Sequence, residues 1–463
     1  MSVSCQSTSS SDAQSMQPPA RVRVLAMLAI SIAVFMAVLD TAVTNTALPT
    51  ITRDLHILGA DAVWIVTTYQ LVMVAAMLPL GAIGEIHGHH RVFVAGLVLF
   101  TLSSLGCGLA WSLSSLVAAR AIQGLGAAAI MSANTALVRF IYPEQKLGRG
   151  LGLNALVIAA GFAAGPTVAS LILSVSTWHW LFLVNVPACG VAALLAWQFL
   201  PATTTAQRRF DWGAALLCAA MFAFIVHGIG EGTHRAPLQV LLAELALAVT
   251  CGYALTRRQS GEAAPLLAVD LFRRPVFSLS AVAAICAFTA QGIAFVSLPF
   301  LLQTSMGRSQ IETGFLITPW PVLGAIMAPI SGSLSDKVPA GFLGGLGLAL
   351  LSVGFAVLAL LPNDASTVLI AGSMTLCGFG FGLFLSPNQR TIMSSAPPER
   401  GGAASGILGV ARLLGQATGA SLVALTLGIS HQHGPVIALW SGCLFALLGG
   451  VLSVLRLFTP RRA

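Results

Sequence analysis

The sequence predicts an all-α protein that crosses a lipid membrane many times. Three observations predict this class: 56% of the 463 residues are hydrophobic, only 8% are charged, and the mean hydropathy is +0.88. A chain of this composition is too apolar for a soluble globule. The net charge of +8 does not indicate a nucleic-acid binder, because the basic residues form no single cluster along the chain.

Fourteen apolar runs are long enough to cross a hydrocarbon core of about 30 Å as helices. Each run is bounded by charged residues, proline or glycine. The predicted spans cover residues 25–48, 62–82, 92–110, 114–138, 150–173, 179–200, 212–230, 238–256, 276–302, 312–334, 340–361, 365–388, 403–428 and 434–457. No long soluble segment remains between them.

The distribution of lysine and arginine predicts the orientation in the membrane. If the N-terminus is cytoplasmic, 18 of the 23 basic residues lie in inner segments, and only Arg53, Arg235 and Arg308 lie in outer loops. Basic residues are retained on the cytoplasmic side of membrane proteins. We therefore expect both termini in the cytoplasm and the protein in the plasma membrane, which in bacteria is the inner membrane.

An internal repeat divides the spans into two halves. A shift of 254 residues superposes Gly124 on Gly378 and Gly165 on Gly419, without a gap over about 40 residues. The predicted organisation is a disordered cytoplasmic tail (1–24), a six-helix bundle (25–200), a linker with two inserted helices (201–275), a second six-helix bundle (276–457) and a second cytoplasmic tail (458–463). Two six-helix halves in the same orientation are typical of transporters whose binding site lies between the halves.

The first span carries a carboxylate, Asp40, about 5 Å past its midpoint. An ionised carboxylate at such a depth costs about 3 kcal/mol on insertion scales, so it usually faces a cavity or a partner and marks an ion or substrate path. A hydrogen bond between helices, without a role in transport, is the alternative interpretation. Arg120, in span 114–138, lies at a similar depth and also requires a partner.

Four motifs resemble the major facilitator superfamily and, within it, the branch of fourteen-helix drug:proton antiporters. They are the L-D-T run that extends to A-L-P (39–49), R-A-I-Q-G (120–124), G-A-I-G-E-I-H-G-H-H-R (81–91) and G-F-A-A-G-P (161–166). Together they are more specific than any one of them. The resemblance covers residues 25–457 and implies the major facilitator fold with fourteen transmembrane helices.

The resemblance implies that Asp40 is the carboxylate that binds the proton or faces a cation. It further implies that Arg120, Gln123, Asn45 and Arg412 take part in proton or substrate coupling. Two alternatives stay open at this point. Arg120 could be a packing clamp held by backbone carbonyls of the first helix, and Arg412 could be a structural anchor.

The resemblance also implies that the loop at 81–91 closes the cytoplasmic side. Here Glu85 replaces the usual aspartate, while His89 and His90 replace common basic residues, which predicts either a looser, pH-sensitive gate or simply solvated histidines. Small residues four positions apart allow close helix packing, and a proline kinks a helix. The predicted gating residues are Gly81, Glu85, Gly88, Arg91, Gly161, Gly165, Pro166 and Asp336.

These observations predict a proton-coupled antiporter that exports lipophilic, neutral or cationic drugs and toxic compounds by alternating access, and hence multidrug efflux and antibiotic resistance. The predicted pocket residues are Phe35, Met36, Gln291, Phe295 and Trp320. Gln291 occupies the repeat position of Asp40, so the expected site is asymmetric. The alternative is a transporter of the same fold for a metabolite or organic anion, which Arg120 and Arg412 would bind.

We expect no enzymatic activity, because no catalytic constellation or soluble domain is visible. The eight cysteines show no C-x-x-C spacing, so we expect neither disulfides nor a metal, and no cofactor other than the proton gradient. The expected partners are small amphiphilic substrates, protons and the lipid bilayer, with no nucleic acid, and we expect a monomer. Glu244, in the second inserted helix, is expected near the outer headgroups or beside His227 rather than in proton coupling.

Overall fold

The computed structural model describes residues 19–459 except 143, 204, 207–209, 232–237, 261, 263–264, 267, 398–399 and 431. The described residues are almost entirely helical, and none of them is in a strand. The two predicted tails lie largely outside the described residues. The first helix begins at Ala20, so the last residues of the predicted N-terminal tail are helical.

The N half is defined here as residues 20–199 and contains the first predicted bundle. Its helices are α1 (Ala20–Asp54), α2 (Gly59–Ala62), α3 (Trp64–His87), α4 (His89–Gly108), α5 (Leu113–Ile141), α6 (Glu144–Val175), α7 (His179–Leu183) and α8 (Asn185–Phe199). Ser112 caps α5 in a reciprocal arrangement with Ser115, which satisfies backbone groups at the start of that helix. The C-terminal end of α3 is set by Gly88, whose φ of 97° favours glycine.

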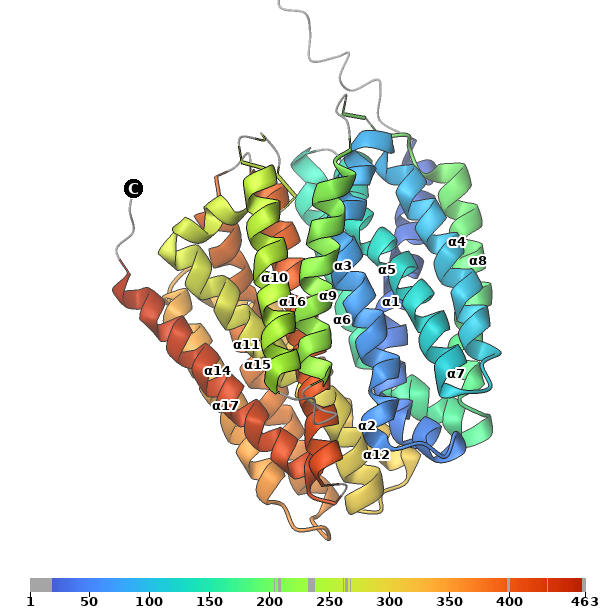
Figure 1. Ribbon diagram of the computed structural model, residues 1–463, viewed down its shortest axis with the longest axis vertical. Coiled ribbons are helices and arrows are strands. Elements are labelled where there is room, and N and C mark those ends of the chain that lie inside the picture. Colours follow the sequence, from blue (N-terminus) through green and yellow to red (C-terminus); the bar gives the residue numbers. More distant parts are fainter. Residues whose placement is uncertain are drawn as a thin grey trace, which may run out of the picture.

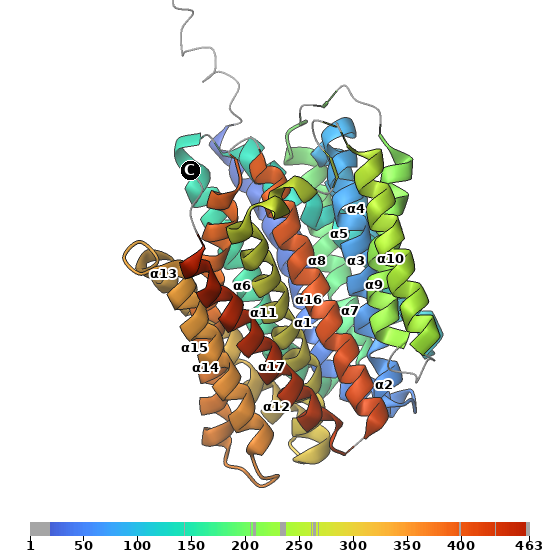
Figure 2. The same ribbon diagram turned by 60° about the vertical axis from the view of Figure 1, so that its left-hand side comes forward.

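The C half is defined as residues 269–458. Its elements are η2 (Val269–Arg273), α11 (Pro275–Phe300), η3 (Leu301–Ser305), α12 (Gln310–Ile317), α13 (Pro319–Leu334), α14 (Ala340–Leu360), α15 (Thr367–Ser395), α16 (Gly401–Ile429), α17 (Gly434–Leu455) and η5 (Arg456–Phe458). Figures 1 and 2 show the two halves as upright groups of helices that meet along the middle of the molecule.

The packing within the two halves repeats. In the N half α4 packs on α5, α3 on α5, α1 on α6, and α8 on both α1 and α4. In the C half the corresponding pairs are α14 with α15, α13 with α15, α11 with α16, and α17 with both α11 and α14. Between the halves α16 contacts α3 while α6 contacts α12 and α13. The duplication seen in the sequence is therefore also a duplication of the helix packing.

The close contacts between α1 and α6 depend on glycine. A Cβ atom at Gly165 would lie 2.3 Å from the Cβ of Ala42, and one at Gly161 would lie 3.1 Å from the Phe35 carbonyl oxygen. In the C half a Cβ atom at Gly419 would lie 2.4 Å from the Thr289 carbonyl oxygen of α11. Because glycine lacks this atom, the two helix backbones approach one another closely in both halves.

Two further helices, α9 (Trp212–Glu231) and α10 (Leu238–Arg258), correspond to the inserted pair. They pack on each other, and α9 also packs on α3 and α16, so the pair covers one seam between the halves (Figure 1). Twelve other helices of the described residues are long and apolar enough to cross a membrane. The structure therefore confirms the predicted all-α membrane protein, and the inserted pair runs alongside its bundle.

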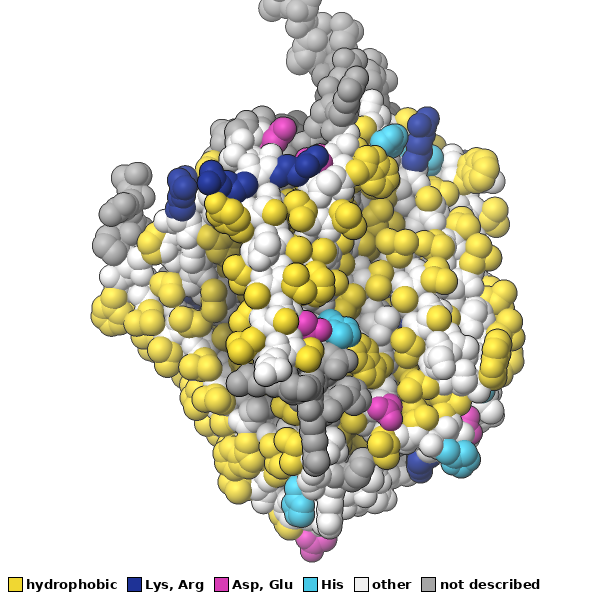
Figure 3. All heavy atoms as spheres, viewed as in Figure 1, with side chains coloured by type: hydrophobic (Ala, Val, Ile, Leu, Met, Phe, Trp, Pro, Cys, Tyr) yellow, Lys and Arg dark blue, Asp and Glu magenta, His cyan; other side chains and the backbone are white. Residues whose placement is uncertain are grey.

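We call the end of the molecule where α1 begins and α17 ends the terminal face, and the other end the opposite face (Figures 1 and 2). In the space-filling view, lysine and arginine side chains gather near the terminal face, and hydrophobic side chains cover much of the visible side between the two ends (Figure 3). This distribution fits a multi-pass protein whose apolar sides contact lipid.

Candidate functional site

Asp40 lies in a buried polar cluster built by three helices of the N half. Its side chain in α1 forms an ion pair with Arg120 of α5, with 2.5 Å between Oδ2 and Nη1. The other carboxylate oxygen, Oδ1, accepts hydrogen bonds from Gln123 Nε2 at 3.0 Å and from Asn185 Nδ2 at 2.8 Å. Asp40 is only 2% exposed and Arg120 is fully buried. Both carboxylate oxygens are therefore occupied, and the charges of the pair cancel away from water.

Arg120 also contacts α3, which lies close to α5. A Cβ atom at Gly124 would lie 2.6 Å from the Tyr69 carbonyl oxygen, so the glycine of the R-A-I-Q-G motif permits this approach. Arg120 Nε donates to the Ile65 carbonyl oxygen at 3.2 Å, and its guanidinium carbon lies 4.1 Å from the centroid of the Tyr69 ring. Arg120 thus combines an ion pair, a backbone contact to α3 and a cation–π contact.

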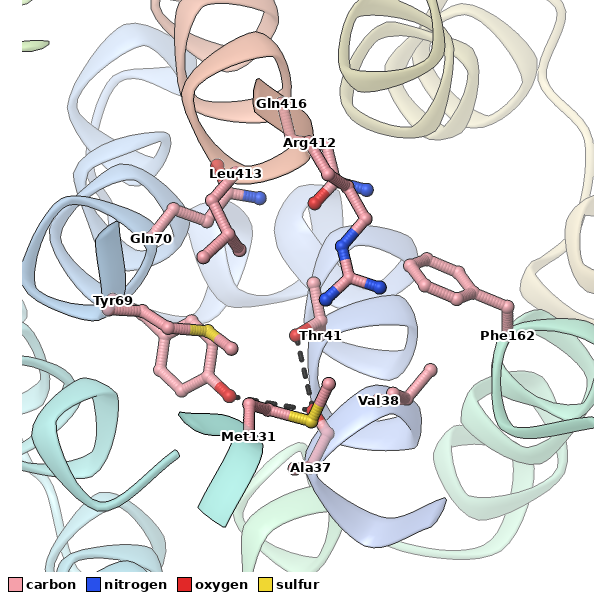
Figure 4. Close-up of a pocket in the computed structure, with 11 residues that line it drawn as sticks. Ala37, Val38, Thr41, Tyr69, Gln70, Met131, Phe162, Arg412, Leu413 and Gln416 are labelled. Carbon is pink, nitrogen blue, oxygen red and sulfur yellow. Dashed lines mark hydrogen bonds between the residues drawn. The ribbon is translucent and has the colours of Figure 1, made fainter. Parts of the chain in front are cut away.

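A small cavity of about 20 Å³ lies between the halves at the level of Tyr69, which is enough for roughly one water molecule. Its lining residues are Ala37, Val38, Thr41, Tyr69, Gln70, Met73, Met131, Phe162, Arg412, Leu413 and Gln416. Asp40 does not line this central cavity, although the sequence led us to expect that it faces the path. Tyr69 separates the two, since its ring packs on Arg120 and its hydroxyl donates to the Ala37 carbonyl oxygen at 3.5 Å (Figure 4).

Arg412 of α16 extends into the central cavity. Its guanidinium group lies near Thr41 and Phe162, from the opposite half (Figure 4). No hydrogen bond or ion pair with any described residue engages it, whereas Arg120 is bound through Nε and Nη1. The neighbouring Gln416 donates through Nε2 to Gln291 Oε1 at 3.0 Å. The structure therefore places two of the predicted residues, Arg412 and Gln291, at or next to the central cavity.

The other predicted pocket residues lie elsewhere. Phe295 and Trp320 are buried in an aromatic cluster of the C half, with 5.7 Å between their ring centroids. Phe295 lies behind Phe162, with 6.2 Å between these two ring centroids. Phe35 and Met36 pack into the core of the N half and do not line the central cavity.

Asn45 is buried in α1, and it too lies outside the central cavity. Sequence reasoning did not single out Asn185, Tyr69 or Gln70 as site residues. The available signal was a polar side chain inside an apolar span, which is costly unless it has a partner. Asn185 in particular follows an aromatic-rich run, Trp178 to Phe182, in the sequence.

Two larger cavities open toward the two ends of the molecule. The terminal-face cavity has a volume of about 580 Å³ and is lined by Gly81, Glu85, His89 and Arg139, among others. It shares Met131 with the central cavity, so the two adjoin. The opposite-face cavity, of about 530 Å³, lies between the ends of α1, α11 and α16.

On the opposite face, three hydrogen bonds join the halves. Gln310 Nε2 donates to Thr50 Oγ1 at 2.7 Å, and the Gln310 carbonyl oxygen accepts from Ser170 Oγ at 2.7 Å. The hydroxyl groups of Thr167 and Thr318 lie 2.8 Å apart. Among the described residues these are the hydrogen bonds between the N half and the C half, and all lie beyond the level of Arg412. The halves are thus tied together on the opposite face.

Some of the predicted gating residues lie near the terminal-face cavity, and others lie in α6. Glu85 and Gly81 line the terminal-face cavity, and Asp336 forms an ion pair with Arg390 of α15. Arg91 is exposed at the start of α4. Pro166 lies within α6, between α1 and α12, where its carbonyl oxygen is 2.5 Å from the site of a Cβ atom at Gly314.

The inserted pair contains a close contact between a histidine and a glutamate side chain. His227 Nδ1 of α9 lies 2.7 Å from Glu244 Oε1 of α10, and the His227 ring lies 6.1 Å from that of Trp64, centroid to centroid. The structure thus places Glu244 beside His227, one of the two locations expected from the sequence. No group of three or more metal-ligating side chains occurs among the described residues.

Comparison with known proteins places this architecture in a family. The model of the Major Facilitator Superfamily matches residues 30–420. The chain is 47% identical to the uncharacterized transporter YebQ of Escherichia coli (strain K12), over 94% of this chain and 96% of the relative. It is 31% identical to the multidrug resistance protein Stp of Mycobacterium tuberculosis (strain CDC 1551 / Oshkosh), over 91% of this chain and 77% of the relative.

Two further comparisons agree with this family assignment. The chain is 30% identical to the tetracenomycin C resistance and export protein of Streptomyces glaucescens, over 86% of this chain and 74% of the relative. The fold resembles the inward-facing, unoccupied crystal structure of a bacterial homolog of the human lysosomal transporter Spinster, with a TM-score of 0.72, 14% identity, and coverage of 95% of this chain and 98% of that one. These matches confirm the predicted fold. The chain is a membrane transporter that belongs to the major facilitator superfamily.

Proposed function

We propose that this transporter is a proton-coupled antiporter that exports amphiphilic, drug-like compounds from the cytoplasm by alternating access. The observation that carries the proposal is the buried Asp40–Arg120 ion pair, which lies directly behind the wall of the central cavity. The names of two relatives, a multidrug resistance protein and a tetracenomycin C resistance and export protein, support export as the direction.

Tyr69 provides the physical link between proton and cargo. One face of its ring packs on Arg120, while its side chain also lines the central cavity. If Asp40 takes up a proton, Arg120 loses its counter-charge and the buried pair becomes unbalanced, which favours a rearrangement of the wall. Cargo that displaces Tyr69 acts on the same pair from the other side. Proton uptake and cargo binding are then coupled through one side chain.

The driving force is sufficient for uphill export. Each unit of the pH gradient contributes about 1.4 kcal/mol per proton. Each charge moved across the membrane contributes about 2.3 kcal/mol per 100 mV. Rocking of the N half against the C half would break the three hydrogen bonds on the opposite face and close the terminal-face cavity. We propose that the terminal face is cytoplasmic, in the inner membrane of a bacterium, because it carries the excess of basic side chains.

The charge of the cargo is a separate question. The sequence favoured neutral or cationic cargo on the assumption that Asp40 faces the path. In the structure its carboxylate is fully engaged by Arg120, Gln123 and Asn185, so no carboxylate lines the central cavity. A second candidate, the export of organic anions, is favoured by the position of Arg412 and is developed in the next subsection.

The test uses purified protein in proteoliposomes with a pH-sensitive dye inside. Ethidium, chloramphenicol and naphthalene-1-acetate serve as cationic, neutral and anionic test compounds. We expect at least one of them to move protons in the opposite direction, and Asp40→Asn to abolish that exchange because an amide cannot bind the proton. The matched control, Asp364→Asn, changes an exposed loop residue and should exchange like wild type. Proton exchange by Asp40→Asn at the wild-type rate would overturn the proposal.

A further inference from the structure

The central cavity contains a positive charge and no negative one. Of its lining residues only Arg412 is charged, and none carries a carboxyl group. Asp40, which precedes the lining residue Thr41 in α1, has both oxygens occupied on the far side of Tyr69. The cavity is therefore electrostatically the opposite of a cation site.

Arg412, which is half-buried, lacks the partners that the two buried arginines have. Arg120 has a carboxylate, and Arg456 at the end of α17 donates to Asn388 Oδ1 at 2.6 Å and to Ser280 Oγ at 2.9 Å. Arg412 makes no ion pair or hydrogen bond with any described residue. A guanidinium group in the interior of a membrane protein is costly unless it is paired, and intramembrane charges mark substrate or ion paths. Its position therefore indicates a partner that arrives from outside the protein.

The residues around Arg412 indicate which chemical groups that partner carries. Gln70 and Gln416 line the same cavity and offer two amide groups near the guanidinium. The Thr41 hydroxyl also lines it and donates to the Ala37 carbonyl oxygen at 3.3 Å. Gln70 can donate through its amide nitrogen, and Gln416 through the amide hydrogen that its bond to Gln291 leaves free, as a bound oxyanion requires. The rest of the lining is apolar and includes Phe162 and Met131. Such a site suits a molecule with one charged end and an apolar body.

We propose that the cargo is an amphiphilic organic anion whose carboxylate, or a similar oxyanion, pairs with Arg412. This rests on the proposed export function and adds the charge class of the cargo. The charged end would reach Arg412 at the central cavity of about 20 Å³, and the terminal-face cavity of about 580 Å³, which shares the lining residue Met131, has room for the apolar body. An arginine can engage an oxyanion with two parallel hydrogen bonds, which a lysine cannot reproduce.

The test compares three probes that share one aromatic body. Naphthalene-1-acetate is an anion, naphthalene-1-acetamide is neutral, and 2-(1-naphthyl)ethylammonium is a cation. Equilibrium binding of each to the purified full chain in lipid nanodiscs at neutral pH gives a Kd. We expect the acetate to bind about ten-fold or more tightly than the acetamide, as a charge-assisted hydrogen bond provides. The ammonium probe should bind weakest.

Variants test whether Arg412 causes the preference for the acetate over the acetamide. In Arg412→Gln the acetate and acetamide should bind within about two-fold of each other, because the charge is gone. Arg412→Lys should keep part of the preference, since it retains the charge without the two parallel hydrogen bonds. Arg257→Gln, on the exposed end of α10, removes one positive charge far from the cavity and should bind like wild type. Monodisperse size-exclusion profiles check that each variant is folded.

The outcomes separate this inference from the proposed function. The inference is overturned if the acetamide or the ammonium probe binds wild type as tightly as the acetate does. It is also overturned if the acetate does not bind saturably, or if folded Arg412→Gln keeps the full preference. Proton exchange with ethidium or chloramphenicol in proteoliposomes would then still support the exporter. Conversely, selective acetate binding that depends on Arg412, without proton exchange by any test compound, would support the anion site and contradict antiport.

Discussion

The two halves of this transporter repeat each other in packing but differ in how they accommodate a buried arginine. In the N half, Arg120 is balanced by the carboxylate of Asp40. In the C half, Arg456 is held by the neutral oxygens of Asn388, Ser280 and Ser453. An aspartate side chain can take up a proton near neutral pH, whereas an amide or hydroxyl oxygen cannot. The difference shows that one scaffold holds a buried arginine with a carboxylate in one half and with neutral oxygens in the other.

The same contrast holds at the level of the central cavity. At the repeat position of Asp40 the C half has Gln291, which accepts a hydrogen bond from Gln416. The C half also contributes Arg412, the one charged side chain that lines the cavity. We infer a division of roles in which the N half responds to protons and the C half binds the cargo. The duplication thus conserves the packing that both halves need for folding and leaves the polar residues free to differ.

The largest expected effect separates the two buried arginines. Arg120→Ala leaves the Asp40 carboxylate buried without a counter-charge, which should destabilise the protein by about 3–5 kcal/mol. Arg456→Ala removes the only charge of its cluster and should cost about 1–3 kcal/mol, from lost hydrogen bonds. Thermal unfolding of the purified variants, followed by tryptophan fluorescence, measures both.

A double variant provides the control for this difference. Asp40→Asn combined with Arg120→Gln removes both charges, so it should be more stable than Arg120→Ala alone. The proposed distinction between the halves would be wrong if Arg456→Ala were as damaging as Arg120→Ala. It would also be wrong if the charge-free double variant recovered no stability.

A smaller effect tests whether the halves are equivalent in packing. Gly165→Ala and Gly419→Ala each place a methyl group within about 2.4 Å of the neighbouring helix, at corresponding positions of the repeat. Each should therefore destabilise the protein by about 1–3 kcal/mol. Gly372→Ala is the matched control, because a Cβ atom there meets nothing within 4 Å, and alanine favours the helix. Unfolding midpoints that drop for only one of the two glycines would break the equivalence.

The smallest effect concerns the inserted pair, which belongs to neither half. Asp211, just before α9, accepts two hydrogen bonds from Arg258 Nε at the end of α10, at 2.8 and 3.0 Å. This contact lowers the pKa of Asp211. A carboxyl group whose pKa is lowered in the folded state stabilises the protein above its ordinary pKa, and this stabilisation is lost as the pH falls through the lowered value.

The variant Asp211→Asn should therefore lower the unfolding midpoint slightly at neutral pH and not at all at a pH below the lowered pKa. The effect is small because the ion pair is exposed to solvent. Asparagine still accepts a hydrogen bond from the Ala214 amide at the start of α9, so the substitution isolates the ion pair. A midpoint difference of equal size at both pH values would show that the charge is not responsible.

Much of the fold could be predicted because its causes are local in the sequence. Hydrophobic length predicts a membrane helix, and the periodic recurrence of glycines such as Gly165 and Gly419 reveals the duplication. The pairing of Asp40 with Arg120 could be predicted in outline, because two opposite charges at one depth need each other. The hydrogen bond from Asn185 to Asp40 could not be predicted, because it depends on where α8 lies against α1 and α4.

The sequence by itself determined the class of the protein: the apolar spans, the two related halves, the inserted pair and the presence of charges inside the membrane. Only the tertiary structure decided which of those charges lines the central cavity. In the structure, Asp40 points toward Arg120 behind Tyr69, and Arg412 points into the central cavity. The physical reason is that depth along a helix follows from residue number, whereas the direction in which a side chain points matters only relative to neighbouring helices, whose placement depends on packing throughout the molecule.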